Sequence, residues 1–103
     1  MILVCVAMLV PGMVSADMTT ARQTELLHLL KHDCGSCHGM TLQGGLGPAL
    51  TPPALNGKSE AMLRDTILHG RSGTPMPPWK AFMNTQEADW LVQRLQRGTT
   101  DAK

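Results

Sequence analysis

Five consecutive residues, Cys34-Gly35-Ser36-Cys37-His38, constrain the fold of this chain more than any other feature. Two thiols are separated by two residues, so one turn of chain brings both to the same edge of a ligand, and an imidazole follows directly. This spacing is the pattern of covalent haem attachment, in which the thiols add to the two vinyl groups of the porphyrin. The imidazole is then carried under the ring, where it can bind the iron. The sequence therefore predicts one haem c, held by Cys34 and Cys37, with His38 as an axial ligand.

Three other kinds of site use the same residue types. A thioredoxin-like redox pair is expected within a βαβ pattern, which this chain lacks. His28, His32 and the two thiols nominally supply four zinc ligands. However, only Asp33 separates His32 from Cys34, which leaves too little chain to surround one ion. A structural disulfide is permitted in an exported protein, but it gives no role to His38.

The chain is short and poor in aromatic residues. It has 103 residues, enough for one domain, and only 3% of them are aromatic. A chain of this size buries a modest fraction of its surface, and with few large rings its own core is thin. A bulky apolar cofactor would complete such a core. The formal net charge of +1 gives no basic footprint for nucleic acid.

The N-terminal segment has the pattern of an export signal. Residues 2–10 are all apolar, and a Pro-Gly pair and then small residues follow. We predict a signal peptide over residues 1–16, and a mature domain over residues 17–103 that is exported to the periplasm. The apolar run is shorter than the about 20 residues of a membrane span, so no stable membrane anchor is expected. Cys5 is expected to leave with the signal. The usual basic residue before the run is missing, and a translation start upstream of Met1 would supply it.

The mature chain has the pattern of an all-α protein. Three segments combine helical periodicity with an N-cap residue: residues 21–32 after Thr20 (with Gln23 completing a capping box), 60–69 after Ser59, and 86–97 after Thr85. Gly70 and Gly98 stand where helix-ending glycines are expected. Gly and Pro are expected to keep residues 43–57 and 71–78 out of regular structure. No stretch alternates apolar and polar residues, so no strand is predicted.

The second axial ligand decides what a haem with one histidine can do. Met76 is the leading candidate, because Pro75 and Pro77 preset extended backbone on both sides of it and little entropy is lost in holding its thioether. A thioether favours ferrous iron and raises the reduction potential, which suits an electron carrier. His69 is the competing ligand, although a histidine at a helix end more often contacts the last carbonyl groups.

The remaining candidates have weaker signals. Met62 and Met83, on or near helices, are expected to fill the core. Met40 is too close in sequence to the proximal histidine to reach the other face of a haem. Arg71 and Trp79 flank the second loop, and each has an N–H group that suits a haem propionate. A solvated arginine and a core tryptophan are equally consistent with the sequence.

These motifs, in this order, resemble the class I cytochrome c domain. The segments that carry the resemblance are residues 34–38, Gly-Pro-Ala-Leu at 47–50, Thr-Pro-Met-Pro-Pro-Trp at 74–79, and a closing amphipathic helix with Trp90. The resemblance implies the class I cytochrome c fold, with three main helices and long loops around one haem. It implies that the first and last helices cross near Gly or aromatic positions. It also implies that the backbone carbonyl of Pro48 holds the ring N–H of His38.

Residues 44–50 and 67–71 are more narrowly similar to the NirC-type (cytochrome c55X) proteins, small monohaem cytochromes encoded with cytochrome cd1 nitrite reductase. This resemblance implies a periplasmic electron donor to that reductase, or a helper in maturing its d1 haem. We therefore expect a monomeric, non-enzymatic electron carrier with a redox protein as its partner. The alternatives are a ligand-binding haem sensor and a small haem peroxidase, both of which need an open sixth iron site.

Overall fold

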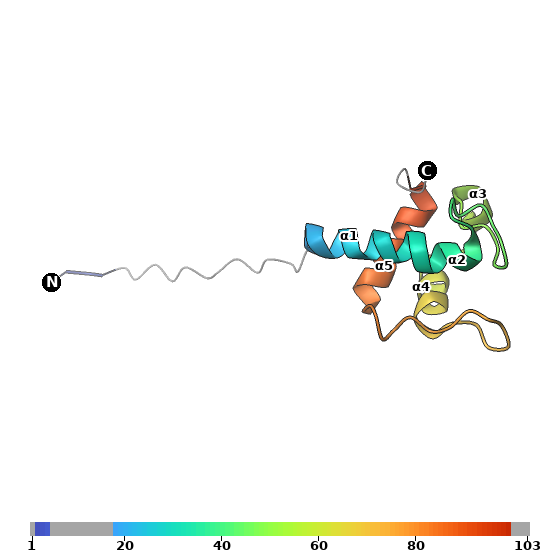
Figure 1. Cartoon of the computed structure of the whole chain (residues 1–103). Coiled ribbons are helices and arrows are strands. Elements are labelled where there is room, and N and C mark those ends of the chain that lie inside the picture. Colours follow the sequence, from blue (N-terminus) through green and yellow to red (C-terminus); the bar gives the residue numbers. More distant parts are fainter. Residues whose placement is uncertain (1, 5–17, 100–103) are drawn as a thin grey trace.

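The structure is a computed structural model, and it describes residues 2–4 and 18–99. The predicted cleavage site after Ala16 and the cysteine at position 5 lie outside the described residues. Residues 18–99 contain helices and loops and no strand, so the all-α prediction is confirmed (Figure 1). Within the same range, no helix has the length and apolar content that crossing a membrane requires.

The first helix, α1 (Thr20–Leu29), begins one residue earlier than predicted. Thr19 is its N-cap, and the Thr19 hydroxyl accepts a hydrogen bond of 3.1 Å from the backbone N–H of Arg22. The predicted capping box of Thr20 with Gln23 is therefore wrong, because Thr20 is already the first helical residue. Adjacent threonines are both good caps, and the sequence pattern alone does not separate them.

The helical rod that starts with α1 is also longer than predicted. It continues through a π-helical turn, η1 (Leu30–Cys34), into α2 (Gly35–His38). In Figure 1 the three segments follow one another along a common direction. The predicted end at His32 is wrong, because a π-turn adds a residue to the repeat and breaks the 3.6-residue pattern without breaking the helix. The cysteine motif therefore lies at the C-terminal end of one rod.

Two shorter helices follow. The first of them, α3 (Pro52–Leu55), lies within residues 43–57, where no regular structure was predicted, so that prediction is wrong. Its two prolines occupy the first helical turn, where a backbone N–H has no partner in the helix. The second, α4 (Glu60–His69), has the predicted bounds, with Ser59 as its N-cap and Gly70 after its last residue.

The last helix, α5 (Thr85–Arg97), starts one residue before the predicted position. Its N-cap is Asn84, not Thr85 as predicted. The Asn84 side chain accepts a 2.8 Å hydrogen bond from the backbone N–H of Glu87, whose carboxylate accepts one of 2.9 Å from the backbone N–H of Asn84. This reciprocal capping box satisfies two donors at once, which explains why asparagine takes the cap in preference to its neighbour.

The variant Asn84→Ala is expected to lower the free energy of unfolding by about 1 kcal/mol, because it removes one half of the capping box. The matched variant Thr85→Ala places alanine at the first helical position and is expected to change stability by less than ~0.5 kcal/mol. Denaturant titration of the two variants beside the wild-type protein measures the difference. Equal losses in both would show that the helix does not depend on this cap.

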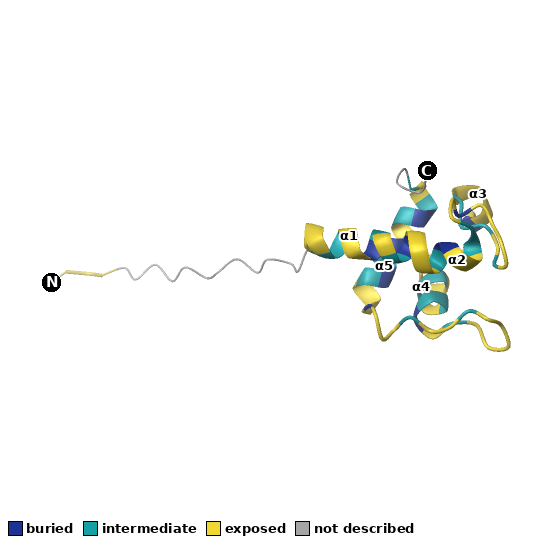
Figure 2. Ribbon diagram, viewed as in Figure 1, coloured by how far each residue is buried: buried dark blue, intermediate teal, exposed yellow. Residues whose placement is uncertain are grey.

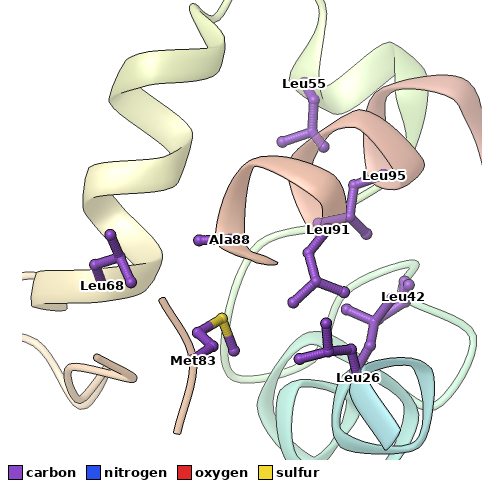
Figure 3. Packing of buried hydrophobic residues seen from close by; sticks show 9 residues of the cluster. Leu26, Leu42, Leu55, Leu68, Met83, Ala88, Leu91 and Leu95 are labelled. Atoms are coloured by element: carbon purple, nitrogen blue, oxygen red, sulfur yellow. The ribbon is translucent and has the colours of Figure 1, made fainter. Parts of the chain in front are cut away.

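The hydrophobic core lies where α5 crosses α1 and α4. The buried cluster is formed by Leu26, Leu30, Leu42, Leu55, Leu68, Met83, Ala88, Leu91 and Leu95. Figure 3 shows Leu26 of α1 directed toward Leu91 of α5. Trp90 is half-buried at the margin of this cluster, and no aromatic side chain is part of it. The described core is thin, as the composition predicts, and consists of aliphatic side chains.

Two methionines expected in the core differ in their surroundings. Met83 is 6% exposed and belongs to the cluster, which confirms its predicted role. Met62 is 46% exposed on α4, so the prediction that it fills the core is wrong. A residue on the solvent-facing side of a helix cannot be told from a core residue when the apolar pattern is weak.

An ion pair between Arg22 of α1 and Glu87 of α5 links the two helices. The Arg22 guanidinium pairs with the Glu87 carboxylate and donates a 2.6 Å hydrogen bond to the carbonyl of Phe82. Arg22 holds the pKa of Glu87 below its usual range, mainly through the hydrogen bond between the two side chains. A lowered folded-state pKa means that this pair stabilises the fold above the ordinary glutamate range. That contribution is lost as the pH falls through the folded-state pKa.

Candidate haem site

The imidazole of His38, the last residue of α2, is held in one orientation. Its Nδ1 lies 2.7 Å from the backbone carbonyl oxygen of Pro48. A carbonyl oxygen only accepts hydrogen bonds, so the Nδ1 atom of the neutral imidazole must carry the proton. The lone pair is then on Nε2, the nitrogen that a metal would bind. This is the contact that fixes tautomer and ring direction in histidine–metal sites.

The loop that presents Pro48 folds back onto the end of the rod. The backbone N–H of Gly47 donates a 2.7 Å hydrogen bond to the carbonyl of Cys37, and that of Gly44 donates one of 2.8 Å to the carbonyl of His38. A Cβ at position 47 would lie 2.8 Å from both Cε1 and Nδ1 of His38, closer than such atoms approach. Only glycine lets the loop lie directly against the imidazole.

The two thiols of the motif occupy different environments. Cys34 is half-buried against the core, and burial, aided by the charge of Asp33, raises the pKa of its thiol to about 11. Cys37 is exposed, and neither thiol is part of a disulfide. Both are therefore available for addition to a ligand, and Cys34 stays protonated at neutral pH.

The residues named for the alternatives to haem can be placed in this geometry. Cys34 and Cys37 are free and are not bonded to each other. Across the residues that the structure describes, no group of three or more His, Cys, Asp or Glu side chains is arranged to hold a metal ion. The motif instead offers two free thiols and one imidazole with a free Nε2, which is the donor set that haem c requires.

The loop that carries Met76 is closed on itself by hydrogen bonds. The backbone N–H of Arg71 donates to the carbonyl of Met76 over 3.2 Å. The hydroxyl of Thr74 donates to the carbonyl of Arg71 over 2.7 Å and accepts from the backbone N–H of Met76 over 3.4 Å. Met76 itself is half-buried. The hydroxyl of Thr74 was not singled out from the sequence, because its role depends on the path of the loop.

A glycine at the end of α4 sets how closely this loop approaches. Gly70 has φ 70° and ψ −169°, a conformation that essentially only glycine adopts. A Cβ there would lie 2.6 Å from the carbonyl oxygen of Met76. Gly73, inside the same loop, also has a positive φ of 75°, but a Cβ at that position would meet nothing within 4 Å. Both glycines therefore have a positive φ, but only Gly70 lies against the backbone of Met76.

The variant Gly70→Ala is expected to displace the backbone of Met76 and to weaken any bond between its sulfur and the iron. The measurable result is loss of the weak far-red absorption of a ferric iron–thioether bond and readier binding of carbon monoxide. Gly73→Ala is the matched control, since it adds a methyl group at positive φ without a collision, and it should keep the far-red band. Loss of the band in both variants would assign the effect to loop strain and not to contact with Met76.

The other predicted residues lie around the same loop. Trp79 is half-buried, its backbone N–H donates to the carbonyl of Ile67 over 3.0 Å, and its ring centroid lies 5.6 Å from that of Phe82. Arg71 is exposed, as is His69 at the last position of α4. Figure 2 shows this loop as mostly exposed and half-buried chain. The proposed contacts of Trp79 and Arg71 with propionates stay predictions.

Comparison with known proteins gives consistent matches. Residues 21–93 match the family described as "Cytochrome C oxidase, cbb3-type, subunit III". Cytochrome c55X of Pseudomonas aeruginosa is 53% identical over 88 residues, which cover 85% of this chain and 74% of that protein. The solved structure of a c-type cytochrome NirC has a TM-score of 0.77 at 56% identity, covering 79% of this chain and 95% of that chain. A structure of dihydro-heme d1 dehydrogenase NirN in complex with DHE has a TM-score of 0.65 at 35% identity. It covers 72% of this chain and 16% of that one.

Proposed function

The chain belongs to the cytochrome c55X family of c-type cytochromes, with the class I fold and one covalent haem c, and we propose that it is a periplasmic electron carrier of the nitrite reductase system. The haem supplies a one-electron ferric/ferrous couple. In this role the protein accepts and donates electrons without transforming a substrate, so it is not an enzyme.

The main structural support for this proposal is the hydrogen bond between the His38 ring and the backbone carbonyl of Pro48. It directs the Nε2 lone pair of the imidazole away from the protein carbonyl and leaves it available to iron. Cys34 and Cys37 would hold the haem through thioether bonds, and His38 and Met76 would supply the two ligands to its iron. Arg71 and Trp79 remain candidates for contacts with the propionates.

A filled sixth site favours an electron carrier over the sensor and the peroxidase. Two hydrogen bonds tie the Met76 backbone to Arg71 and Thr74, two more join Thr74 to Arg71, and the segment lies close to Gly70. These hydrogen bonds limit the conformations of the backbone that carries the thioether. A carrier benefits because its ligands change little between the two oxidation states, whereas a sensor or a peroxidase needs an open position on the iron.

The first candidate partner is cytochrome cd1 nitrite reductase, to which the reduced protein would pass electrons. The relatives named cytochrome c55X and NirC support this association. Docking between electron carriers is brief and uses a small interface. Because the formal net charge of the chain is +1, we expect only moderate dependence on salt, unlike carriers that are steered by a large charged surface.

A second candidate partner follows from the match to dihydro-heme d1 dehydrogenase. That protein contains, within 16% of its length, a region similar to most of this chain. A dehydrogenase removes two electrons from its substrate and must pass them on. A monohaem protein accepts one electron at a time, so two oxidised copies would accept the pair. In this role the chain serves maturation of the d1 haem by accepting electrons.

Stopped-flow mixing separates the two partners. The reduced holoprotein mixed with oxidised cytochrome cd1 nitrite reductase should be oxidised rapidly and should speed nitrite turnover. The oxidised holoprotein mixed with the dehydrogenase and its dihydro-haem substrate should be reduced instead. Negligible transfer in both experiments, together with normal denitrification in a deletion strain, would contradict the proposed function. A deletion strain whose reductase lacks d1 haem would favour maturation over donation.

A further inference from the structure

Two histidines lie together on the exposed side of the rod, just before the cysteine motif in the sequence. His28 is in the last turn of α1 and His32 is in η1, one turn further along. Their ring centroids are 4.2 Å apart, with 45° between the ring planes, and both residues are exposed. Residues four positions apart on a helix are neighbours on its surface, and here the two rings are in contact.

Neither imidazole has another role in the part of the chain that the structure describes. The ring nitrogens of His28 and His32 make no hydrogen bond or ion pair there, and the only ring contact of each is with the other. Cys34, two residues beyond His32, packs against the core and does not join them. The pair is thus a separate feature from the haem motif, although both depend on the same π-helical turn. Such turns are rare and frequently occur at functional sites.

The charges around the pair are balanced. Glu25, one turn before His28, forms an ion pair with Arg22 over 3.0 Å. Exposed Lys31 and Asp33 flank His32 with opposite charges. A divalent cation that approaches the two imidazoles therefore meets no concentrated positive charge. Imidazole nitrogens are ligands that Cu²⁺, Ni²⁺ and Zn²⁺ prefer, and Cu²⁺ is bound most tightly by a given set of nitrogen donors.

We infer that His28 and His32 form a two-histidine binding site for a borderline divalent cation, with Cu²⁺ as its tightest ligand. The two imidazoles supply two nitrogen donors, and water completes the coordination. No third His, Cys, Asp or Glu of the described residues joins them in a metal-binding group. A site with two protein donors exchanges its metal readily. The cation therefore binds reversibly and is not needed to hold the fold together. This inference does not depend on the proposed partner or on the haem ligands.

Isothermal titration of the haem-loaded protein with Cu²⁺ tests the site, with His28→Gln and His32→Gln as the two variants. Glutamine keeps the helix and removes the imidazole. Each variant should bind Cu²⁺ about 100-fold more weakly, because the second imidazole of the pair binds as an intramolecular ligand. His69→Gln is the matched control, since it removes an exposed histidine from the end of another helix, and it should bind like the wild-type protein.

Electron paramagnetic resonance of the Cu²⁺-loaded protein gives an independent reading. Hyperfine structure from two nitrogens is expected in the wild-type protein and from one nitrogen in either variant at high Cu²⁺. Unchanged haem absorption in His28→Gln and His32→Gln would show that the fold is intact. The inference is overturned if the wild-type protein shows no saturable binding. It is also overturned if His28→Gln and His32→Gln bind Cu²⁺ as tightly as the wild-type protein does.

Discussion

The double variant Cys34→Ala/Cys37→Ala is expected to lose covalent haem completely, whereas the wild-type protein should keep its haem through extraction with acidified acetone. The physical reason is that each thiol forms one of the two thioether bonds, and both thiols are free in the structure. The intact mass of the exported wild-type protein should equal the chain from Asp17 plus one haem. Each single variant should keep one thioether or yield an unstable product.

Ser36→Ala is the matched control within the same motif. The Ser36 hydroxyl donates a 2.8 Å hydrogen bond to the carbonyl of Asp33 and contacts the Cys37 Sγ over 3.9 Å. It supplies no thioether bond, so its loss should leave the haem attached. Haem that acid–acetone extracts from the wild-type protein, or a mass that shows a metal without a porphyrin, would contradict the attachment. Because extraction separates covalent from non-covalent haem, this outcome does not depend on the sixth ligand.

The sequence predicted the helices well where their boundaries are decided locally. The α4 helix has the predicted bounds because one good cap, Ser59, precedes it and one glycine follows it. The starts of α1 and α5 were each predicted one residue late, since two capping residues stand next to each other in both places. For α5 the deciding feature was visible in the sequence. With Asn84 as the cap, the glutamate three residues on completes a capping box.

The π-turn and the loop contacts could not be predicted in this way. Nothing in the apolar pattern of residues 30–34 indicates a π-helical turn, which is a rare element. The motif itself predicted the thiols and the imidazole, and the resemblance implied the contact with Pro48. The roles of Gly47 and Gly70, however, depend on which atoms the folded loops bring close to them. The sequence marks Gly70 as a helix-ending glycine, but its close approach to Met76, which Gly73 lacks, is known only from the path of the chain.

Met76→Ala is expected to have the largest effect on the redox properties of the protein. Loss of the thioether removes the ligand that favours ferrous iron, so the reduction potential should fall by a substantial part of the ~0.8 V range that axial ligands control. The far-red band of the ferric protein should vanish, and carbon monoxide should bind readily to the ferrous iron. Redox titration, absorption spectroscopy and carbon monoxide binding measure the three effects in one preparation.

Three variants decide whether Met76 is the correct ligand. They are Met62→Ala, Met83→Ala and His69→Ala, each compared with Met76→Ala. Met62 is 46% exposed on α4, so its variant removes an accessible thioether. Met83 is 6% exposed in the core, so its variant removes a buried one. Met62→Ala should leave the spectrum and potential unchanged. Met83→Ala should lower stability by ~2–5 kcal/mol through the cavity it creates, while the far-red band remains in the folded protein. If Met76→Ala keeps the band and another methionine variant loses it, the wrong sulfur has been chosen. If no methionine variant matters and His69→Ala changes the spectrum, both axial ligands are histidines, and the potential should then be low enough to favour a different partner.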